Sequence, residues 1–152
     1  MGLDCSHDAF HGAYSAFNRL RQAVCKAIGG SYPPHWIYSP KGEILYFFSG
    51  MPATREDLDP DLFYWDDEGD YNPDSHPGLF EFLRHSDCDG EISPTMADKV
   101  AGDLEEILPR VKDLGWESAG HIKARGGFVE VLRKFIDGCR RASQSEEPII
   151  FH

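Results

Sequence analysis

The sequence has few basic residues, no paired cysteines and no long hydrophobic run. It holds 15 Lys and Arg against 26 Asp and Glu, and a formal net charge of −11 argues against direct nucleic-acid binding through a general basic surface. None of its four cysteines forms a Cys-x-x-Cys pair, so neither a disulfide framework nor a structural zinc site is expected. No apolar run reaches the roughly 18 residues of a membrane span, and the first residues lack the features of a secretion signal. We therefore expect a cytoplasmic protein with reduced thiols.

Motifs of several large enzyme classes are also absent. The chain contains no Gly-x-Ser-x-Gly, no P-loop and no dinucleotide-binding fingerprint. Its 152 residues, of which 41% are hydrophobic and 12% aromatic, suit one ordered domain with a substantial core. We expect a single domain over residues 1–152.

The spacing of apolar residues predicts an α+β fold. Helical periodicity predicts helices over residues 13–28, 79–84, 94–108 and 128–139, the first capped by Ser6 or Asp8 and the third ended or kinked by Pro109. Aromatic and branched residues on both sides of a Ser-Pro-Lys-Gly turn predict a β-hairpin over 35–48. Residues 3–6 and 148–152 are predicted terminal strands that could pair with each other. Three to four helices would then pack on a small antiparallel sheet.

An acidic, aromatic-rich loop is expected at about residues 50–77. Between Glu56 and Asp74 the chain has nine acidic residues and no Lys or Arg, with Phe63, Tyr64 and Trp65 among them. A charged stretch of this kind is most often a solubility device. The alternative is that aromatic anchors inside an acidic rim bind and inhibit a basic host protein.

The run from His85 to Ile92 concentrates one imidazole, one thiol and three carboxylates. Asp87, Asp89, Gly90 and Ile92 match the spacing of positions 3, 5, 6 and 8 of an EF-hand calcium loop. His85 and a methionine stand where that loop needs carboxylates, so calcium binding is disfavoured. A structural turn is favoured, with Asp87 capping it, Gly90 at a positive φ and Ile92 in the core.

A second polar run, Asp4 to His11, carries two histidines four residues apart. If the first helix begins early, His7 and His11 share a face and could chelate a divalent transition metal, although the zinc-protease signature is absent. Exposed histidines near a helix start are more often plain polar surface. Should the two runs meet in space, they would form a mixed nitrogen and oxygen metal site from His7, His11, His85, Asp87 and Asp89.

The same polar groups could instead bind a small polar ligand, including a nucleotide. The residues expected to do so are Asp4, His7, Tyr14, Ser15, His85, Asp87 and Arg125. His121 and Arg125 also lie close to the start of the last predicted helix, where an anion could bind, although such a pair is usually ordinary surface. If the site is catalytic, hydrolysis by a metal- or histidine-activated water is the most natural chemistry.

Three segments carry a resemblance to a known group of proteins. Gly2-Leu3-Asp4-Cys5-Ser6-His7, the segment 12–17 (Gly-Ala-Tyr-Ser-Ala-Phe) and the run 85–92 resemble small proteins of bacteriophages and of some soil bacteria. The resemblance implies a phage-type accessory protein, a class that often acts against host defence by binding a host protein or by sequestering a nucleotide signal. It implies no reaction and no catalytic residue.

Overall fold

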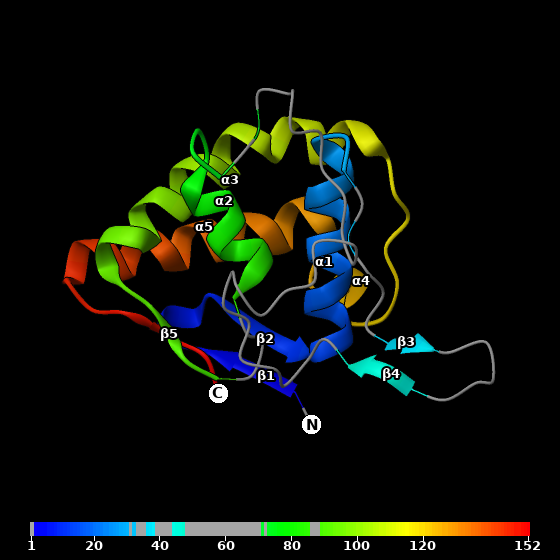
Figure 1. Cartoon of the computed structure of the whole chain (residues 1–152), viewed down its shortest axis with the longest axis horizontal. Helices are drawn as coiled ribbons and strands as arrows, with labels where there is room; N and C mark the ends of the chain where they lie inside the picture. The colour runs from blue at the N-terminus through cyan, green and yellow to red at the C-terminus, as the bar shows by residue number, and fades with distance from the viewer. Residues whose placement is uncertain are drawn as a thin grey trace.

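The computed structural model describes residues 2–30, 32, 36–38, 44–47, 71, 73–85 and 89–152, with 36–38 and 44–47 described by their backbone alone. It confirms a small α+β fold (Figure 1). In chain order the described elements are β1 (Gly2–Cys5), the short 3-10 helix η1 (Ser6–Asp8), β2 (Phe10–Ala13), α1 (Tyr14–Ala27), β3 (Trp36–Tyr38), β4 (Ile44–Phe47), α2 (Pro77–Arg84), β5 (Glu91–Ile92), α3 (Pro94–Leu114), α4 (Gly120–Ala124), α5 (Phe128–Ser145) and β6 (Ile149–Ile150).

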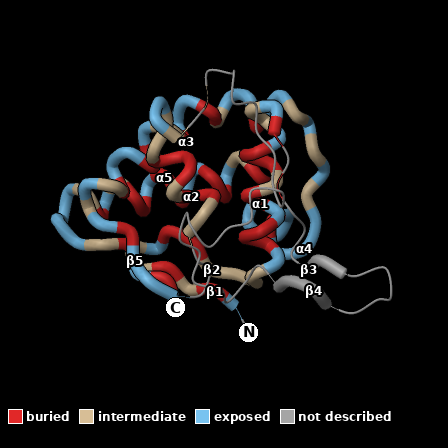
Figure 2. Tube along the Cα trace, in the orientation of Figure 1, coloured by how far each residue is buried: buried red, intermediate tan, exposed pale blue. Residues whose placement is uncertain are grey.

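The core lies between the helices. Phe17 of α1, Phe82 of α2 and Phe135 of α5 are at most 1% exposed, and their ring centroids are 5.2 to 5.8 Å apart. Two of the three contacts are edge-to-face, the arrangement that aromatic quadrupoles favour. Figure 2 shows that the buried stretches of these helices face one another. The apolar stripes read from the sequence therefore meet in one core.

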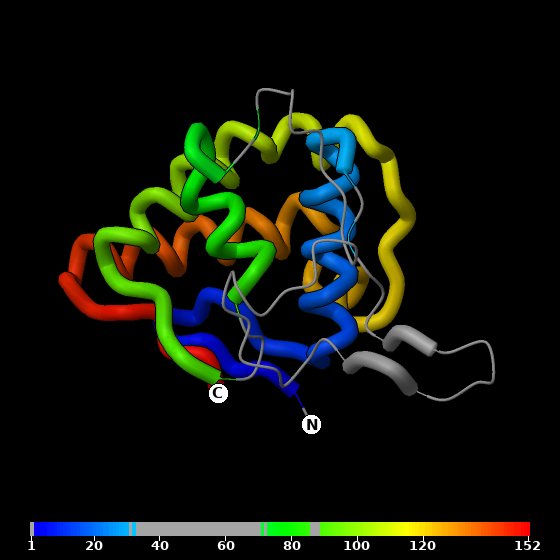
Figure 3. The backbone as a smooth tube through the Cα atoms, in the orientation of Figure 1, coloured from blue at the N-terminus to red at the C-terminus, as the bar shows by residue number. Residues whose placement is uncertain are grey.

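The two ends of the described chain are paired. Cys5 forms an antiparallel bridge with Phe151, and the backbones of Asp4 and His152 exchange hydrogen bonds of 2.8 and 3.0 Å. On its other side the C-terminal segment pairs with β5, since β5 and β6 are antiparallel and the Phe151 N–H donates to the Gly90 carbonyl at 2.9 Å. Figure 3 shows the C-terminal segment beside β1. The predicted pairing of the terminal strands is confirmed.

Several predicted elements are confirmed close to their expected bounds. Helices α1, α2 and α5 cover the predicted segments, and β3 and β4 form the predicted antiparallel hairpin. Helix α3 begins where Ser93 predicts, because the Ser93 hydroxyl accepts a hydrogen bond from the Met96 N–H at 3.2 Å. No helix in the described part of the chain is long and apolar enough to cross a membrane.

Two helix ends differ from those predicted. Of the two outcomes predicted at Pro109, an end or a kink, the end is wrong: α3 continues through the proline to Leu114, and the buried Val111 lies beyond it. Helix α1 begins only at Tyr14, with Ala13 as its N-cap, so neither Ser6 nor Asp8 caps it. The residues before it form η1 and β2, where strand pairing buries Phe10.

Candidate functional site

The turn between β1 and β2 has an unusual backbone. His7 and Asp8 are successive non-glycine residues with φ values of 58° and 56°, the left-handed region that side chains disfavour. Contacts from elsewhere hold this turn: the Arg141 guanidinium donates to the His7 carbonyl from Nε at 3.1 Å and from Nη2 at 2.5 Å. Gly138 lets α5 approach closely, since a Cβ there would lie 2.5 Å from the Cβ of Ala9. Helix α5 thereby holds the turn on both sides of Asp8, at His7 and at Ala9.

His11 lies between two carboxylates. Its Nε2 is 2.7 Å from Oδ1 of Asp8, and its Nδ1 contacts Oδ1 of Asp4, the residue opposite it in the β1–β2 register. The His11 hydrogen bond, assisted by the charges of His11, Lys134 and Arg141, lowers the pKa of Asp8 from its ordinary value of 3.8. Because the two carboxylates contact different ring nitrogens, they cannot coordinate one metal ion together with this imidazole.

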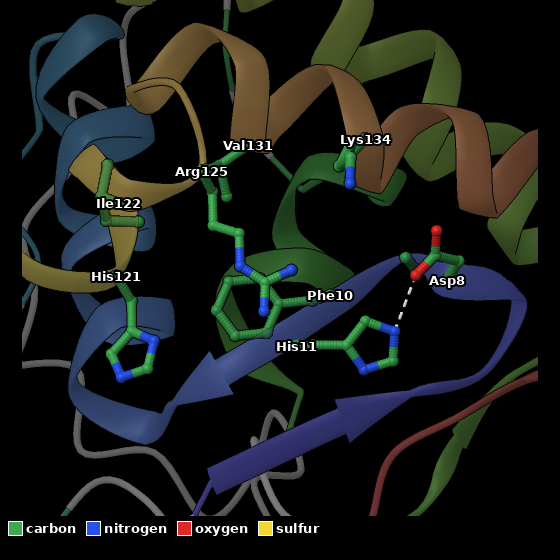
Figure 4. A pocket seen from close by; sticks show the side chains of 9 residues that line it. Asp8, Phe10, His11, His121, Ile122, Arg125, Val131 and Lys134 are labelled. Atoms are coloured by element: carbon green, nitrogen blue, oxygen red, sulfur yellow. Dashed lines mark hydrogen bonds and ion pairs between the residues drawn. The ribbon is translucent and has the colours of Figure 1, made fainter.

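A pocket opens beside this histidine, between β2, α4 and α5. It encloses about 360 Å³, including the part open to solvent, and is lined by Asp8, Ala9, Phe10, His11, His121, Ile122, Arg125, Val131 and Lys134. Three of its four apolar residues, Phe10, Ile122 and Val131, are 3 to 6% exposed and form the pocket floor together with the buried Ala9. Figure 4 shows the side chains of His11, His121, Arg125 and Lys134 arranged around that floor.

A shallower groove adjoins the pocket along the β1–β2 pair. It is lined by Gly2, Leu3, Asp4, His11, Gly12, Ala13 and His121, so the two histidines belong to both depressions. Gly12 lies where they meet: a Cβ at this position would be 3.3 Å from Cζ of Phe10 and 3.7 Å from Nδ1 of His121. A residue larger than glycine would fill this junction.

The charge of the pocket is opposite to that of the chain. Four basic side chains line it and only one carboxylate, Asp8, whereas the chain as a whole carries −11. The side chains of His121, Arg125 and Lys134 form no hydrogen bond or ion pair with other residues that the structure describes. The charged groups of Arg125 and Lys134 therefore remain available to an anion.

Of the nine predicted site residues the structure brings three to this region, leaves five elsewhere and does not describe Asp87. Arg125 and His11 line the pocket, and Asp4 lines the groove. His7 turns toward Glu147, with Nε2 3.5 Å from Oε2, and Tyr14 and Ser15 lie in the first turn of α1 outside both depressions. The prediction that His7 and His11 share a helix face is wrong, because η1 and β2 replace the helix there.

The described part of the second predicted run, His85 and residues 89–92, lies on the other side of the C-terminal segment. The His85 ring is 4.2 Å from the Phe151 ring, and its Nε2 is 3.1 Å from the Glu91 carbonyl oxygen. As a structural turn requires, Gly90 has a φ of 88° and Ile92 is 1% exposed, while Asp89 accepts a hydrogen bond from the Gly90 N–H at 2.8 Å. Asp87 lies outside the described residues.

No cluster of three or more metal-ligating side chains occurs among the residues with a described placement. The metal prediction therefore gains no support from His7, His11, His85 and Asp89. Burial raises the pKa of the Cys25 and Cys139 thiols to about 12, so neither is a nucleophile at neutral pH. The acidic segment 56–74 lies outside the described residues apart from Tyr71 and residues 73–74, and its binding to a basic protein stays a prediction.

Sequence reasoning missed the apolar floor and Lys134. One signal was present for part of the site: His121 and Arg125 are four residues apart and would share a face of any helix across 120–125. The short α4 was not predicted, because five residues give too little periodicity to recognise. Comparison of the chain with protein-family models, with curated proteins and with solved structures finds no match.

Proposed function

We propose that the protein binds a small organic anion in the pocket between β2, α4 and α5. The observation that carries this proposal is a set of basic side chains, three of them without a hydrogen bond or ion pair to the described residues, around an apolar floor on a strongly acidic chain. Chance placement of surface charge on this chain would favour carboxylates. A local excess of cations at a concave apolar surface is what recognition of an anion requires.

The lining residues provide two kinds of contact to a ligand, charged and apolar. The planar guanidinium of Arg125 can hold a carboxylate or phosphate through two parallel hydrogen bonds, and Lys134 adds a compact charge. Phe10, Ile122 and Val131 offer apolar surface to the body of the ligand. Phe10 is the one aromatic residue among those that line the pocket, so a compact ligand with a single ring is a suitable probe.

The arrangement favours binding over acid–base chemistry by His11. Each of its ring nitrogens faces a carboxylate oxygen, so neither is directed at a bound ligand in this state. His11 instead keeps Asp4 and Asp8 in place along the pocket and groove. The protein can act by capturing its ligand, with no reaction.

Isothermal titration calorimetry with 3-phenylpropionate, a carboxylate on one ring, tests this proposal. The double variant Arg125→Gln/Lys134→Gln should weaken binding by about tenfold or more, since it removes two charge-assisted contacts. The matched control is Arg133→Gln/Lys123→Gln, which removes the same charges from α5 and α4 but does not line the pocket. The control variant should change the affinity by about twofold at most, because it alters only long-range electrostatic attraction, which salt screens.

Two results would contradict the proposal. One is absence of binding to the wild-type protein at low ionic strength, with inorganic phosphate tested beside the carboxylate. The other is equal loss of affinity in both double variants, which would mean that the net charge of the molecule governs binding and that the pocket does not.

A further inference from the structure

The single carboxylate in the cationic pocket calls for an explanation. Asp8 lines the same depression as Arg125 and Lys134, where a negative charge opposes the capture of any simple anion. Its carboxylate Oδ1 accepts from His11, while Oδ2 forms no hydrogen bond with a residue that the structure describes. Asp8 thus keeps an acceptor available at the edge of the pocket.

The backbone places this carboxylate at a conformational cost. Asp8 and the preceding His7 both have left-handed φ values, which are disfavoured for non-glycine residues and occur most often at binding sites and turns. The turn is held from three sides: by Arg141 on the His7 carbonyl, by the close approach of Ala9 to Gly138, and by Ser6, whose Oγ accepts from the Ile150 N–H at 2.8 Å. Figure 4 shows Asp8 at the end of the pocket where Lys134 and His11 also lie.

We propose that Asp8 makes the pocket selective for a zwitterion, an organic anion that also carries an ammonium group on the same small apolar body. This inference rests on the proposed function and specifies the class of its ligand. The ligand carboxylate would bind Arg125, its apolar part would cover Phe10, and its ammonium would donate to Asp8. An ammonium has three N–H donors and no acceptor, so it matches a carboxylate that still has a free oxygen.

A pair of probes isolates the role of the ammonium. L-Phenylalanine and 3-phenylpropionate share the ring and the carboxylate and differ by the ammonium group. Wild-type protein should bind phenylalanine about fivefold or more tightly than 3-phenylpropionate, because only phenylalanine compensates the charge of Asp8.

The variant Asp8→Asn should reverse this preference. It should weaken the binding of phenylalanine by about tenfold and strengthen the binding of 3-phenylpropionate by about twofold to fivefold. The substitution removes an attraction for the first probe and a repulsion for the second. Asparagine tolerates the left-handed backbone of this position, so the fold should be retained, as a thermal melt would verify. The control Asp113→Asn makes the same charge change at the exposed end of α3 and should shift neither affinity.

The outcomes separate this inference from the proposed function. If 3-phenylpropionate binds and Asp8→Asn changes both probes in the same direction, zwitterion selectivity is overturned while anion binding stands. If neither probe binds the wild-type protein, the proposed function itself fails. An Asp8→Glu variant gives a second check, because retention of the negative charge should keep phenylalanine the tighter ligand.

Discussion

At the scale of single residues, the pair Asp8 and His11 gives a measurable signature of the site. The His11 hydrogen bond lowers the pKa of Asp8 below 3.8. A carboxyl with a lowered pKa in the folded state contributes stability above its unfolded pKa and loses that contribution as the pH falls through the folded value. The contribution is small because Asp8 is exposed and solvent screens the pair.

NMR titration of the Asp8 carboxyl carbon checks this arrangement directly. The wild-type protein should give an Asp8 pKa below 3.8, and His11→Gln should return it toward that ordinary value, because the charged hydrogen-bond partner is lost. Identical titration curves in the two proteins would show that His11 and Asp8 do not interact in solution.

At the scale of elements, the packing of α2 on α3 depends on a missing side chain. A Cβ on Gly78 would overlap backbone atoms of Lys99 and Val100, so the two helices can approach this closely only because residue 78 is glycine. We expect Gly78→Ala to lower the free energy of unfolding by about 1–3 kcal/mol through overpacking, measured by urea denaturation.

Gly102 supplies the control for that substitution. It lies in α3 with nothing within 4 Å of the position of its Cβ. Gly102→Ala should therefore stabilise the protein by about 0.5–1 kcal/mol, the ordinary gain of alanine over glycine inside a helix. Equal effects of the two substitutions would show that α2 and α3 are not in close contact at Gly78.

The elements that the sequence predicted well are those whose burial pattern is periodic over several turns. Helices α3 and α5 have long amphipathic stripes, and the buried stripe of α3 continues past Pro109 to Val111. An early helix start was predicted because Ser6 or Asp8 could cap it, whereas the structure has η1 and β2 before Tyr14. The left-handed φ values of His7 and Asp8, which decide that segment, leave no periodic signal.

The candidate site was predicted only in part, because it joins residues near the start of the chain to residues between 121 and 134. Each contributes a few residues: Phe10 and His11 from β2, Arg125 after α4, and Lys134 from α5. The polar run Asp4 to His11 indicated His11, but its spacing suggested His7 as its neighbour in the site. In the structure His11 lines the pocket with His121. An apolar floor cannot be distinguished from ordinary core residues by sequence pattern alone.

At the scale of the whole molecule, the C-terminal segment links β1 and β5 by pairing with both. Ile149 is fully buried, whereas its neighbour Ile150 is 45% exposed. Ile149→Ala should lower the free energy of unfolding by about 2–5 kcal/mol, because it removes buried methyl groups and leaves a cavity. Ile150→Ala makes the same change on the exposed side of the strand and should lower the free energy of unfolding far less in the same chemical denaturation experiment. Equal losses in the two variants would show that Ile149 is not the buried residue of this strand.

The charge distribution of the whole molecule underlies the central claim. A chain of net charge −11 gathers four basic side chains at one apolar pocket. The most direct test is a map of backbone amide chemical-shift changes in the wild-type protein during titration with 3-phenylpropionate. The account predicts saturable changes centred on residues 8–12, 121–125 and 131–134. Saturable changes centred elsewhere, or none up to millimolar ligand at low salt, would contradict it.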